Sequence, residues 1–302
     1  MKHIDSSIHQ TYLLILCFFL FMTGCQRFQT TIIPEEKVFK APCLKTVSPA
    51  VQYHIIGSSV ENRAIGYLVL GEGQDVIFII ASIHGNETAG TPLVLLLAQY
   101  LQDHYDLLEG RKLVILPVAN PDGMFNNSRY NANGIDLNRN FPTRNRINSP
   151  RFGRAAFSEP ETRIIDLLIQ QYDPDRIVSL HEPLACVDYD GPGETLAEHM
   201  AECCNLSVKK LGARPGSLGS YTGETLGIPT ITLELTEHAK QFDSEYLWEL
   251  YGEALISAVI YPDIVELYTF PRERHDESGE EVFFNNSDSQ KAFENEAVTP
   301  SK

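Results

Sequence analysis

Four side chains in three separate segments could together hold a metal ion and move a proton. His84 and Glu87 stand three residues apart, shortly after an apolar run that ends at Ala81. His181 follows a second apolar run, and Glu234 stands inside a third. Sites of α/β proteins lie at the carboxyl ends of strands, and two histidines with one glutamate form a ligand set of catalytic zinc. The pattern predicts one Zn²⁺ ion bound by His84, Glu87 and His181.

Each of these residues, taken alone, also has a simpler interpretation. Asn86 could cap a helix beside a solvated Glu87, and a histidine at a strand end is usually a hydrogen-bonded polar residue. Glu234 could lie on a solvated strand face. An unpaired carboxylate inside an apolar strand is costly to bury, however, so a buried Glu234 would need a functional or pairing role.

Strands that alternate with helices must position these side chains. Apolar or β-branched runs predict the strands, and several are apolar on both sides, as in sheets covered on both faces. Ser158, followed by Pro160 and Glu161, predicts a helix that starts in a capping box. We expect an α/β domain with a mixed, largely parallel sheet and helices on both faces. The expected strands cover 64–70, 76–81, 112–118, 176–180 and 230–235, and the expected helices cover 88–104, 158–172, 194–210 and 244–260.

The two ends of the chain show patterns that differ from this domain. An apolar run over 12–22 is too short to span a bilayer but suits a signal peptide, and Thr23-Gly24-Cys25 follows it. This ending resembles the lipobox of bacterial lipoproteins, which predicts lipidation of Cys25. The expected organisation is a signal peptide over 1–25, a tether over 26–50, the α/β domain over 51–270 and a disordered acidic tail over 271–302.

These patterns predict an exported protein of the cell envelope, held in the periplasm by a lipid anchor at Cys25. Plain secretion, an uncleaved anchor and a cytoplasmic location are the alternatives. An oxidising compartment would permit disulfides among Cys43, Cys186, Cys203 and Cys204, although buried free thiols are the simpler interpretation. The sequence does not indicate which of them pair, or an oligomeric state.

The net charge of the chain excludes one class of partner. Lys and Arg total 24 against 40 Asp and Glu, which gives a formal charge of −16 and a pI near 4.9. Such a surface is unsuited to nucleic-acid phosphates. We therefore expect no nucleic-acid partner.

Five segments place potentially reactive residues at fixed positions: His84-x-x-Glu87, Asn120-Pro121-Asp122-Gly123, Gly134-Ile135-Asp136-Leu137-Asn138-Arg139-Asn140-Phe141, His181 and Thr232-Leu233-Glu234-Leu235. They occur in the order and approximate spacing of the zinc carboxypeptidase family, which the chain resembles over roughly residues 55–260. The resemblance implies a zinc carboxypeptidase-like fold and makes the α/β domain over 51–270 a zinc peptidase domain.

The resemblance also implies a role for each candidate residue. His84, Glu87 and His181 hold zinc, Glu234 acts on the water that zinc activates, and Arg129 polarises the scissile carbonyl. General chemistry agrees, because zinc lowers the pKa of bound water from about 15.7 to about 7, a carboxylate can transfer its proton, and a guanidinium can offset charge on oxygen.

The resemblance implies substrate binding for Asn138, Arg139 and Tyr221, and a supporting role for Asp136. Asn138 and Arg139 hold the terminal carboxylate of the substrate, a task that suits the planar guanidinium fork. Asp136 accepts a hydrogen bond from the second ring nitrogen of His84. Tyr221 stands near the place where the family carries a pocket-lining aromatic residue, with a packing or turn role as the alternative. Asn86 departs from digestive carboxypeptidases, which carry Arg there, and this difference weakens the case for ordinary peptide specificity.

Three segments, 134–142, 179–184 and 215–221, resemble the bacterial branch of murein peptide amidases. This branch cuts the bond between γ-D-glutamate and meso-diaminopimelate, so we expect a zinc-dependent amidase with a murein peptide as substrate. The alternatives are a carboxypeptidase for ordinary peptides, a deacylase of small acylated amino acids, and a zinc- or peptide-binding lipoprotein without catalysis. The family also predicts a cis peptide one residue beyond the third ligand, at Glu182-Pro183.

Overall fold

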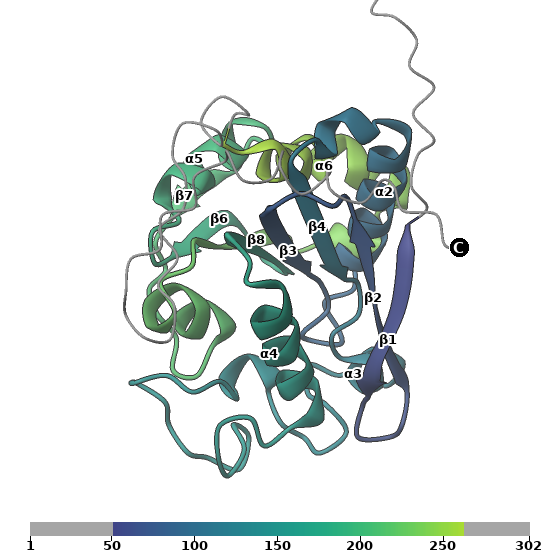
Figure 1. Cartoon of the computed structure of the whole chain (residues 1–302). Coiled ribbons are helices and arrows are strands. Elements are labelled where there is room, and N and C mark those ends of the chain that lie inside the picture. The colour runs from purple at the N-terminus through teal and green to yellow at the C-terminus, as the bar shows by residue number, and fades with distance from the viewer. Residues whose placement is uncertain (1–50, 263–302) are drawn as a thin grey trace, which may run out of the picture. The chain divides into compact units, whose positions relative to one another are not determined.

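The computed structural model describes residues 51–262, which form an eight-stranded mixed sheet with helices (Figure 1). The strands are β1 (Gln52–Ser58), β2 (Ala64–Leu70), β3 (Asp75–Ile80), β4 (Arg111–Leu116), β5 (Arg176–His181), β6 (Leu184–Asp190), β7 (Ser207–Lys209) and β8 (Thr230–Thr236). The helices are α2 (Gly90–Asp103), α3 (Pro121–Phe125), α4 (Pro160–Tyr172), α5 (Glu194–Glu202) and α6 (Ser244–Ile260), with the short segments η1 (Tyr105–Leu108), η2 (Leu137–Arg139), η3 (Ser220–Thr225) and η4 (Ala239–Gln241).

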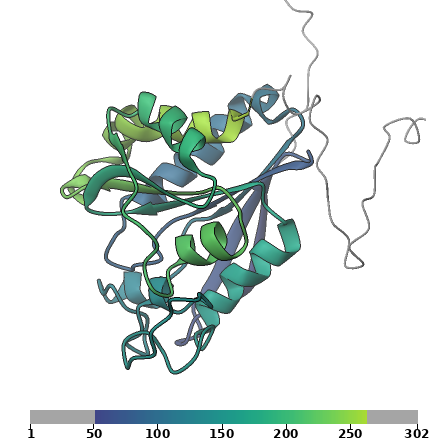
Figure 2. The same cartoon turned by 90° about the vertical axis from the view of Figure 1, so that its left-hand side faces the viewer.

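The centre of the sheet is parallel, which brings the candidate residues to one edge. The strand order is β1-β2-β4-β3-β5-β8-β6-β7, with parallel pairs at β4-β3, β3-β5 and β5-β8. Strand β6 runs antiparallel to β8. Figure 2 shows α2, α5 and α6 along one face and α4 with η3 along the other. The predicted α/β class, with a mixed sheet covered on both faces, is confirmed.

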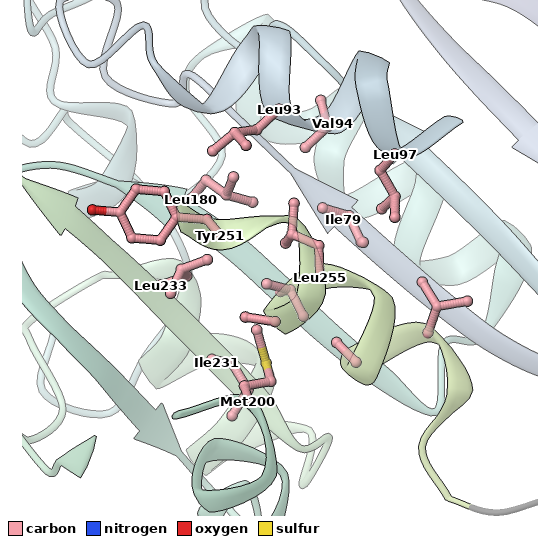
Figure 3. Packing of buried hydrophobic residues seen from close by; sticks show 14 of the residues in the cluster. Ile79, Leu93, Val94, Leu97, Leu180, Met200, Ile231, Leu233, Tyr251 and Leu255 are labelled. Carbon is pink, nitrogen blue, oxygen red and sulfur yellow. The ribbon is translucent and has the colours of Figure 1, made fainter. Parts of the chain in front are cut away.

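Both faces of the sheet bury apolar side chains. On one face, Leu93 and Leu97 of α2 and Leu255 of α6 pack over Ile79 and Leu233 of the sheet (Figure 3). On the other face, a second cluster joins strand residues such as Phe78 to Ile165 of α4 and to Phe141. This double coverage explains why the central strands are continuous apolar runs rather than alternating ones.

The sequence pattern predicted the central strands more accurately than the strands towards the edges of the sheet. All five expected strands and the helix over 244–260 are present within a few residues of their expected bounds. The helix expected over 194–210 was too long, because α5 ends at Glu202 and residues 207–209 pair with β6 as strand β7. Strands β1 and β6 were not expected.

The expected capping box at the start of α4 was wrong. Glu159 is the residue that precedes the helix, and it makes no side-chain cap hydrogen bond. Ser158 donates to the Glu159 carboxylate instead, while Glu161 accepts hydrogen bonds from Val60 N and Asn131 Nδ2. The neighbouring Glu159 therefore binds Ser158, and tertiary partners bind Glu161, in place of the pairing within the capping box.

Several predictions fall outside the described residues. These are the signal peptide over 1–25 with Cys25, the tether over 26–50 with Cys43, and the acidic tail over 271–302. Among residues 51–262, Cys186, Cys203 and Cys204 are free thiols. Within the same range, none of the helices combines the length and apolar character needed to cross a bilayer.

Candidate metal centre

Two candidate ligands lie in the turn that joins β3 to α2, and the third ends β5. His84 and Glu87 follow β3, and His181 is the last residue of the parallel neighbour β5. Gly85 allows the turn to pass close to the start of α3, because a Cβ atom there would lie 2.0 Å from the carbonyl carbon of Gly123. The glycine is thus required by a close approach of two backbones.

Ligand atoms from these three buried residues converge on one point. Glu87 Oε2 lies 2.9 Å from His84 Nδ1 and 2.9 Å from His181 Nδ1, and the two nitrogens are 3.1 Å apart. They form a candidate metal-binding group in which each residue offers one ligand atom. Ligand atoms bound at about 2.0–2.1 Å to a tetrahedral zinc ion lie roughly 3.3 Å from one another, so this donor set fits a zinc ion.

Asp136 and Arg129 surround the two ligands of the turn. Asp136 Oδ1 lies 3.1 Å from His84 Nε2, and its other oxygen accepts a hydrogen bond of 3.0 Å from Arg129 Nε. Arg129 Nη1 donates to Glu87 Oε1 at 3.0 Å. A proton held on Nε2 by Asp136 leaves the lone pair of His84 Nδ1 directed at the shared point.

The surrounding charges keep both carboxylates ionised. Burial alone would raise the pKa of Glu87, but hydrogen bonds with His181 and His84 outweigh it and hold the pKa well below its usual range. Burial also opposes ionisation of Asp136, yet the His84 hydrogen bond and the charges of His84, Arg129 and Arg139 keep its pKa well below the ordinary value. Both groups are therefore available as anions at neutral pH.

Glu234 lies beside the third ligand. It is paired in register with His181 across β5 and β8, and its Oε2 accepts a hydrogen bond of 3.3 Å from Leu184 N. Its side chain is buried, as the sequence indicated for a residue inside an apolar run. Burial raises the pKa of Glu234, against the opposing effects of His181 and Leu184 N. A carboxylate with a raised pKa is suited to accept and return a proton.

Asn138 and Arg139 extend the site away from the ligands. Asn138 Oδ1 accepts a hydrogen bond of 2.8 Å from Leu218 N, and its Nδ2 lies 3.5 Å from His181 Nε2. Arg139 is partly buried; burial lowers the pKa of its guanidinium, the charge of Asp136 opposes this effect, and the neighbouring cations Arg129 and Arg214 lower the pKa further. Three guanidinium groups thus contribute positive potential here, which suits an anionic group such as a carboxylate.

Tyr221 has contacts of a different kind. Its ring stacks on Phe141, with centroids 5.8 Å apart, and meets the edge of Phe157. Its hydroxyl donates a hydrogen bond of 2.7 Å to Asp166 of α4. These contacts place Tyr221 in the apolar cluster beneath α4, so they favour the packing alternative over the predicted substrate-binding role.

One neighbour of the third ligand was missed by the sequence interpretation. Glu182 Oε1 accepts a hydrogen bond of 3.0 Å from Ala89 N, and its own N–H donates to Glu87 Oε2 at 3.2 Å. It therefore ties the end of β5 to the turn that carries the other two ligands. Its position directly after His181 was the available signal. The predicted cis peptide at Glu182-Pro183 is confirmed.

Comparison with known proteins agrees with this fold. The family model described as zinc carboxypeptidase matches residues 43–192. Murein peptide amidase A of Escherichia coli K12 is 35% identical over 191 residues, which cover 57% of this chain and 76% of the relative. Murein peptide amidase A of Vibrio campbellii is 33% identical over 175 residues, which cover 52% of this chain and 68% of the relative. The crystal structure of murein-tripeptide amidase from Escherichia coli O157 superposes with a TM-score of 0.55 and 26% identity, covering 70% of this chain and 93% of that chain.

The fold and these relatives define a metallopeptidase, which is a hydrolase. The chain belongs to the zinc carboxypeptidase family, whose members depend on zinc. The predicted family and enzyme class are confirmed.

Proposed function

We propose that the chain hydrolyses murein peptides at the bond between γ-D-glutamate and meso-diaminopimelate. The observation that carries the proposal is the convergence of His84, Glu87 and His181 beside Glu234, in a chain 35% identical to murein peptide amidase A. The wider carboxypeptidase relatives leave a carboxypeptidase for ordinary peptides as the second candidate. Carboxypeptidase M of Mus musculus, for example, is 33% identical over 129 residues.

The proposed metal ligands are His84, Glu87 and His181. A bound zinc ion would supply a Lewis acid, which polarises a carbonyl oxygen and lowers the pKa of water from about 15.7 to about 7. Asp136 holds the ring of His84 in the orientation that presents Nδ1, as its hydrogen bond to Nε2 supports. The nearby carboxylates and imidazoles are buried, so little bulk water surrounds the reacting groups.

Glu234 is the proposed general base and acid. It takes a proton from the water that attacks the amide carbon and passes this proton to the leaving amine nitrogen as the C–N bond breaks. Arg129 offsets the negative charge that develops on the carbonyl oxygen. Its side chain is 36% exposed beside Glu87, a position that supports contact with substrate.

Arg139 and Asn138 are the proposed binding groups for a free carboxylate on the leaving residue. The planar fork of a guanidinium can donate two parallel hydrogen bonds to a carboxylate. Positive potential from Arg129 and Arg214 at Arg139 supports this role.

We also propose that the enzyme acts in the cell envelope, since its substrate would be a wall peptide. The apolar run over 12–22 and Cys25 after it support export and lipid anchoring. Labelling with a radioactive fatty acid tests the anchor, because Cys25→Ser would abolish incorporation if Cys25 is the modified residue.

A turnover assay tests the proposed function. Purified protein receives either L-alanyl-γ-D-glutamyl-meso-diaminopimelate or an ordinary dipeptide with a free C-terminus. The proposal expects faster release of diaminopimelate, and faster cleavage of the ordinary dipeptide would favour the second candidate. Zinc analysis accompanies the assay: His181→Ala should lose the metal, while His104→Ala, an exposed histidine at the end of α2, should retain it. Full zinc occupancy in His181→Ala would remove that ligand.

A further inference from the structure

Two glutamates at the start of α4 are buried without a cation. Glu159 is 5% exposed and Glu161 is fully buried. Within residues 51–262, no arginine, lysine or histidine forms an ion pair with either carboxylate. Burial raises the pKa of Glu161, the hydrogen bonds that it accepts oppose this effect, and the charge of Glu159 adds to the rise. Two buried carboxylates are costly unless hydrogen-bond donors compensate, so both acids need donors from other parts of the chain.

The side chain of Asn131 joins the two acids. Its Nδ2 donates hydrogen bonds of 2.8 Å to Glu159 Oε2 and 3.1 Å to Glu161 Oε2. Its Oδ1 accepts hydrogen bonds from Asn133 N and Ile135 N, both of 3.1 Å. A carboxamide can make four such bonds, two as donor and two as acceptor, so this side chain is used to its full capacity. Asn131 therefore links the turn that it begins to the start of α4.

This turn, residues 131–135, lies between two groups of the metal centre. Arg129 precedes it by two residues, and Asp136 follows it directly. Arg129 Nε donates to Asp136 Oδ2 at 3.0 Å, and Asp136 Oδ1 lies 3.1 Å from His84 Nε2. No helix or strand covers residues 126–136. The backbone between the two groups therefore depends on the hydrogen bonds of Asn131 for its shape.

Both carboxylate oxygens of Glu161 accept hydrogen bonds. While Oε2 accepts from Asn131, Oε1 accepts a hydrogen bond of 3.2 Å from Val60 N, in the turn between β1 and β2. The residue itself lies in the first turn of α4. A glutamine offers one acceptor oxygen and one donor group, so it could satisfy only one of these two donors. A neutral side chain of the same shape therefore cannot replace Glu161.

We propose that Asn131 and Glu161 are positioning residues, which hold Arg129 and Asp136 in the geometry that the metal centre requires. The inference rests on the proposed roles of Arg129 and Asp136, but it does not depend on which peptide is hydrolysed. Misplacing a reacting group by about 1 Å can cost about 10²-fold in rate. Groups that orient a metal ligand typically contribute about 10- to 100-fold in metal affinity or activity.

Two substitutions of opposite charge test the positioning role. Asn131→Asp keeps the acceptor of the turn but replaces the donor by a third carboxylate, whereas Glu161→Gln removes one charge and one acceptor. We expect kcat to fall about ten- to a hundredfold in both variants with KM nearly unchanged, and zinc affinity to fall about tenfold in a chelator competition. A direct electrostatic effect on Arg129 would instead change kcat in opposite directions, which would overturn the inference.

Leu168→Ala is the matched control for stability. Leu168 is a fully buried residue of the same helix and belongs to the apolar cluster beneath it. The loss of packing should lower the melting temperature, while the folded fraction keeps the kcat and zinc affinity of the wild type. If Asn131→Asp and Glu161→Gln behave as this control does, the two residues only stabilise the fold and the inference is wrong.

Two combined variants show whether the effect passes through the named groups. In an Arg129→Met background, Asn131→Asp should lower kcat by less than about twofold, because the group that it positions is already absent. The same loss in both backgrounds would exclude positioning of Arg129. Asn131→Asp combined with Glu161→Gln exchanges donor and acceptor, so the new amide can donate to the new carboxylate and part of the lost kcat should return. Fully additive losses would contradict a role for this hydrogen bond.

The remaining outcomes separate this inference from the proposed function. If Asn131→Asp does not fold, Glu161→Gln gives the answer on the same criteria. Unchanged zinc affinity in both variants would remove Asp136 from the inference. If no γ-D-glutamyl substrate is cleaved, the proposed function fails by itself, and the positioning role is decided by the zinc affinities and by turnover of an ordinary peptide.

Discussion

The two ends of the parallel strands each bury a cluster of charged residues, and the clusters differ in how their charges are satisfied. At the amino ends, Asp75, Arg111 and Arg176 are the first residues of β3, β4 and β5. At the carboxyl ends, the turn after β3 and the end of β5 provide the candidate ligands. Both clusters are almost fully shielded from water.

The amino-end cluster pairs each cation with acceptors. Arg176 donates to both oxygens of Asp75 at 2.7 and 2.8 Å, and to the carbonyls of Ala258 and Val259 at 2.8 and 2.9 Å. Arg111 donates to the carbonyls of Ile260 and Pro262 at 2.6 and 2.5 Å. These hydrogen bonds attach the C-terminal end of α6 to the sheet.

The carboxyl-end cluster instead brings acceptors together. His84 Nδ1, His181 Nδ1 and Glu87 Oε2 all lie within 3.1 Å of one another. A buried ion pair is complete without a ligand, whereas three converging lone pairs are stabilised by a shared cation. The comparison predicts that changes at the carboxyl end mainly affect chemistry and metal binding, and that changes at the amino end mainly affect stability.

The largest expected effect is on turnover at the carboxyl end. Glu234→Gln keeps the shape of the side chain but removes the proton acceptor, so kcat should fall by about 10² to 10⁴-fold. Zinc content and melting temperature should stay close to the wild type. Turnover near the wild-type rate would exclude Glu234 from proton transfer.

The next effect is on stability at the amino end. Arg176→Met leaves Asp75 buried beside fewer donors, so the free energy of unfolding should fall by about 3–5 kcal/mol in a urea titration. Arg154→Met, a change at an exposed arginine, should stay within about 0.5 kcal/mol of the wild type. The folded fraction of Arg176→Met should retain its zinc affinity. A large loss of zinc affinity with unchanged stability would contradict the prediction that the amino-end cluster acts on stability and not on metal binding.

The sequence could predict the metal centre because its signals are local. His84 and Glu87 share one turn, and His181 ends a strand that is apolar along its length. The central strands could be predicted for the same reason, since each is a continuous apolar run. Only the first two ligands are close in sequence; His181 lies 94 residues after Glu87, so its place in the set depended on the strand end and on the resemblance to the zinc carboxypeptidase family.

Features that depend on long-range pairing could not be predicted in this way. Asp188 lies level with Thr232 and Ser179 only because β6 runs antiparallel to β8, and two aspartates near a glycine are more typical of a turn than of a buried strand. Tyr221 stands near a family position for a pocket residue, yet tertiary packing directs its ring to Phe141. Glu161 likewise has tertiary partners in place of a local cap.

A smaller effect is expected from the residue that orients a ligand. Asp136→Asn should weaken zinc binding by about 10- to 100-fold, because the amide supports the His84 tautomer less well than a carboxylate does. Competition with a chromogenic chelator measures the affinity. Asp103→Asn, at an exposed position in α2, is the control and should not change it. Equal zinc affinities in both variants would show that Asp136 does not affect zinc binding by His84.

The smallest expected effect concerns Asp190, a buried carboxylate whose surroundings differ from those of both clusters. Asp190 has neither the arginine partner of the amino-end cluster nor the converging ligands of the carboxyl-end cluster, and its Oδ1 has no hydrogen-bond partner within residues 51–262. Burial, with the nearby charges of Asp188 and Glu224, raises the pKa of Asp190 to about 6 from an ordinary 3.8. The folded protein therefore binds a proton more tightly than the unfolded chain, so this group reduces stability as pH rises from about 4 to about 6.

Asp190→Asn removes this titration. Above pH 6 the variant should be more stable than the wild type by about 1–2 kcal/mol, a value reduced for partial solvent screening, and the difference should shrink towards zero near pH 4. Urea titrations at several pH values measure it, with Asp103→Asn as a control that should show no such pH-dependent gain. A constant difference across this pH range would mean that packing against η3, and not the buried charge, determines the effect. A gain confined to high pH would show that the sheet tolerates an uncompensated carboxylate at the end of β6.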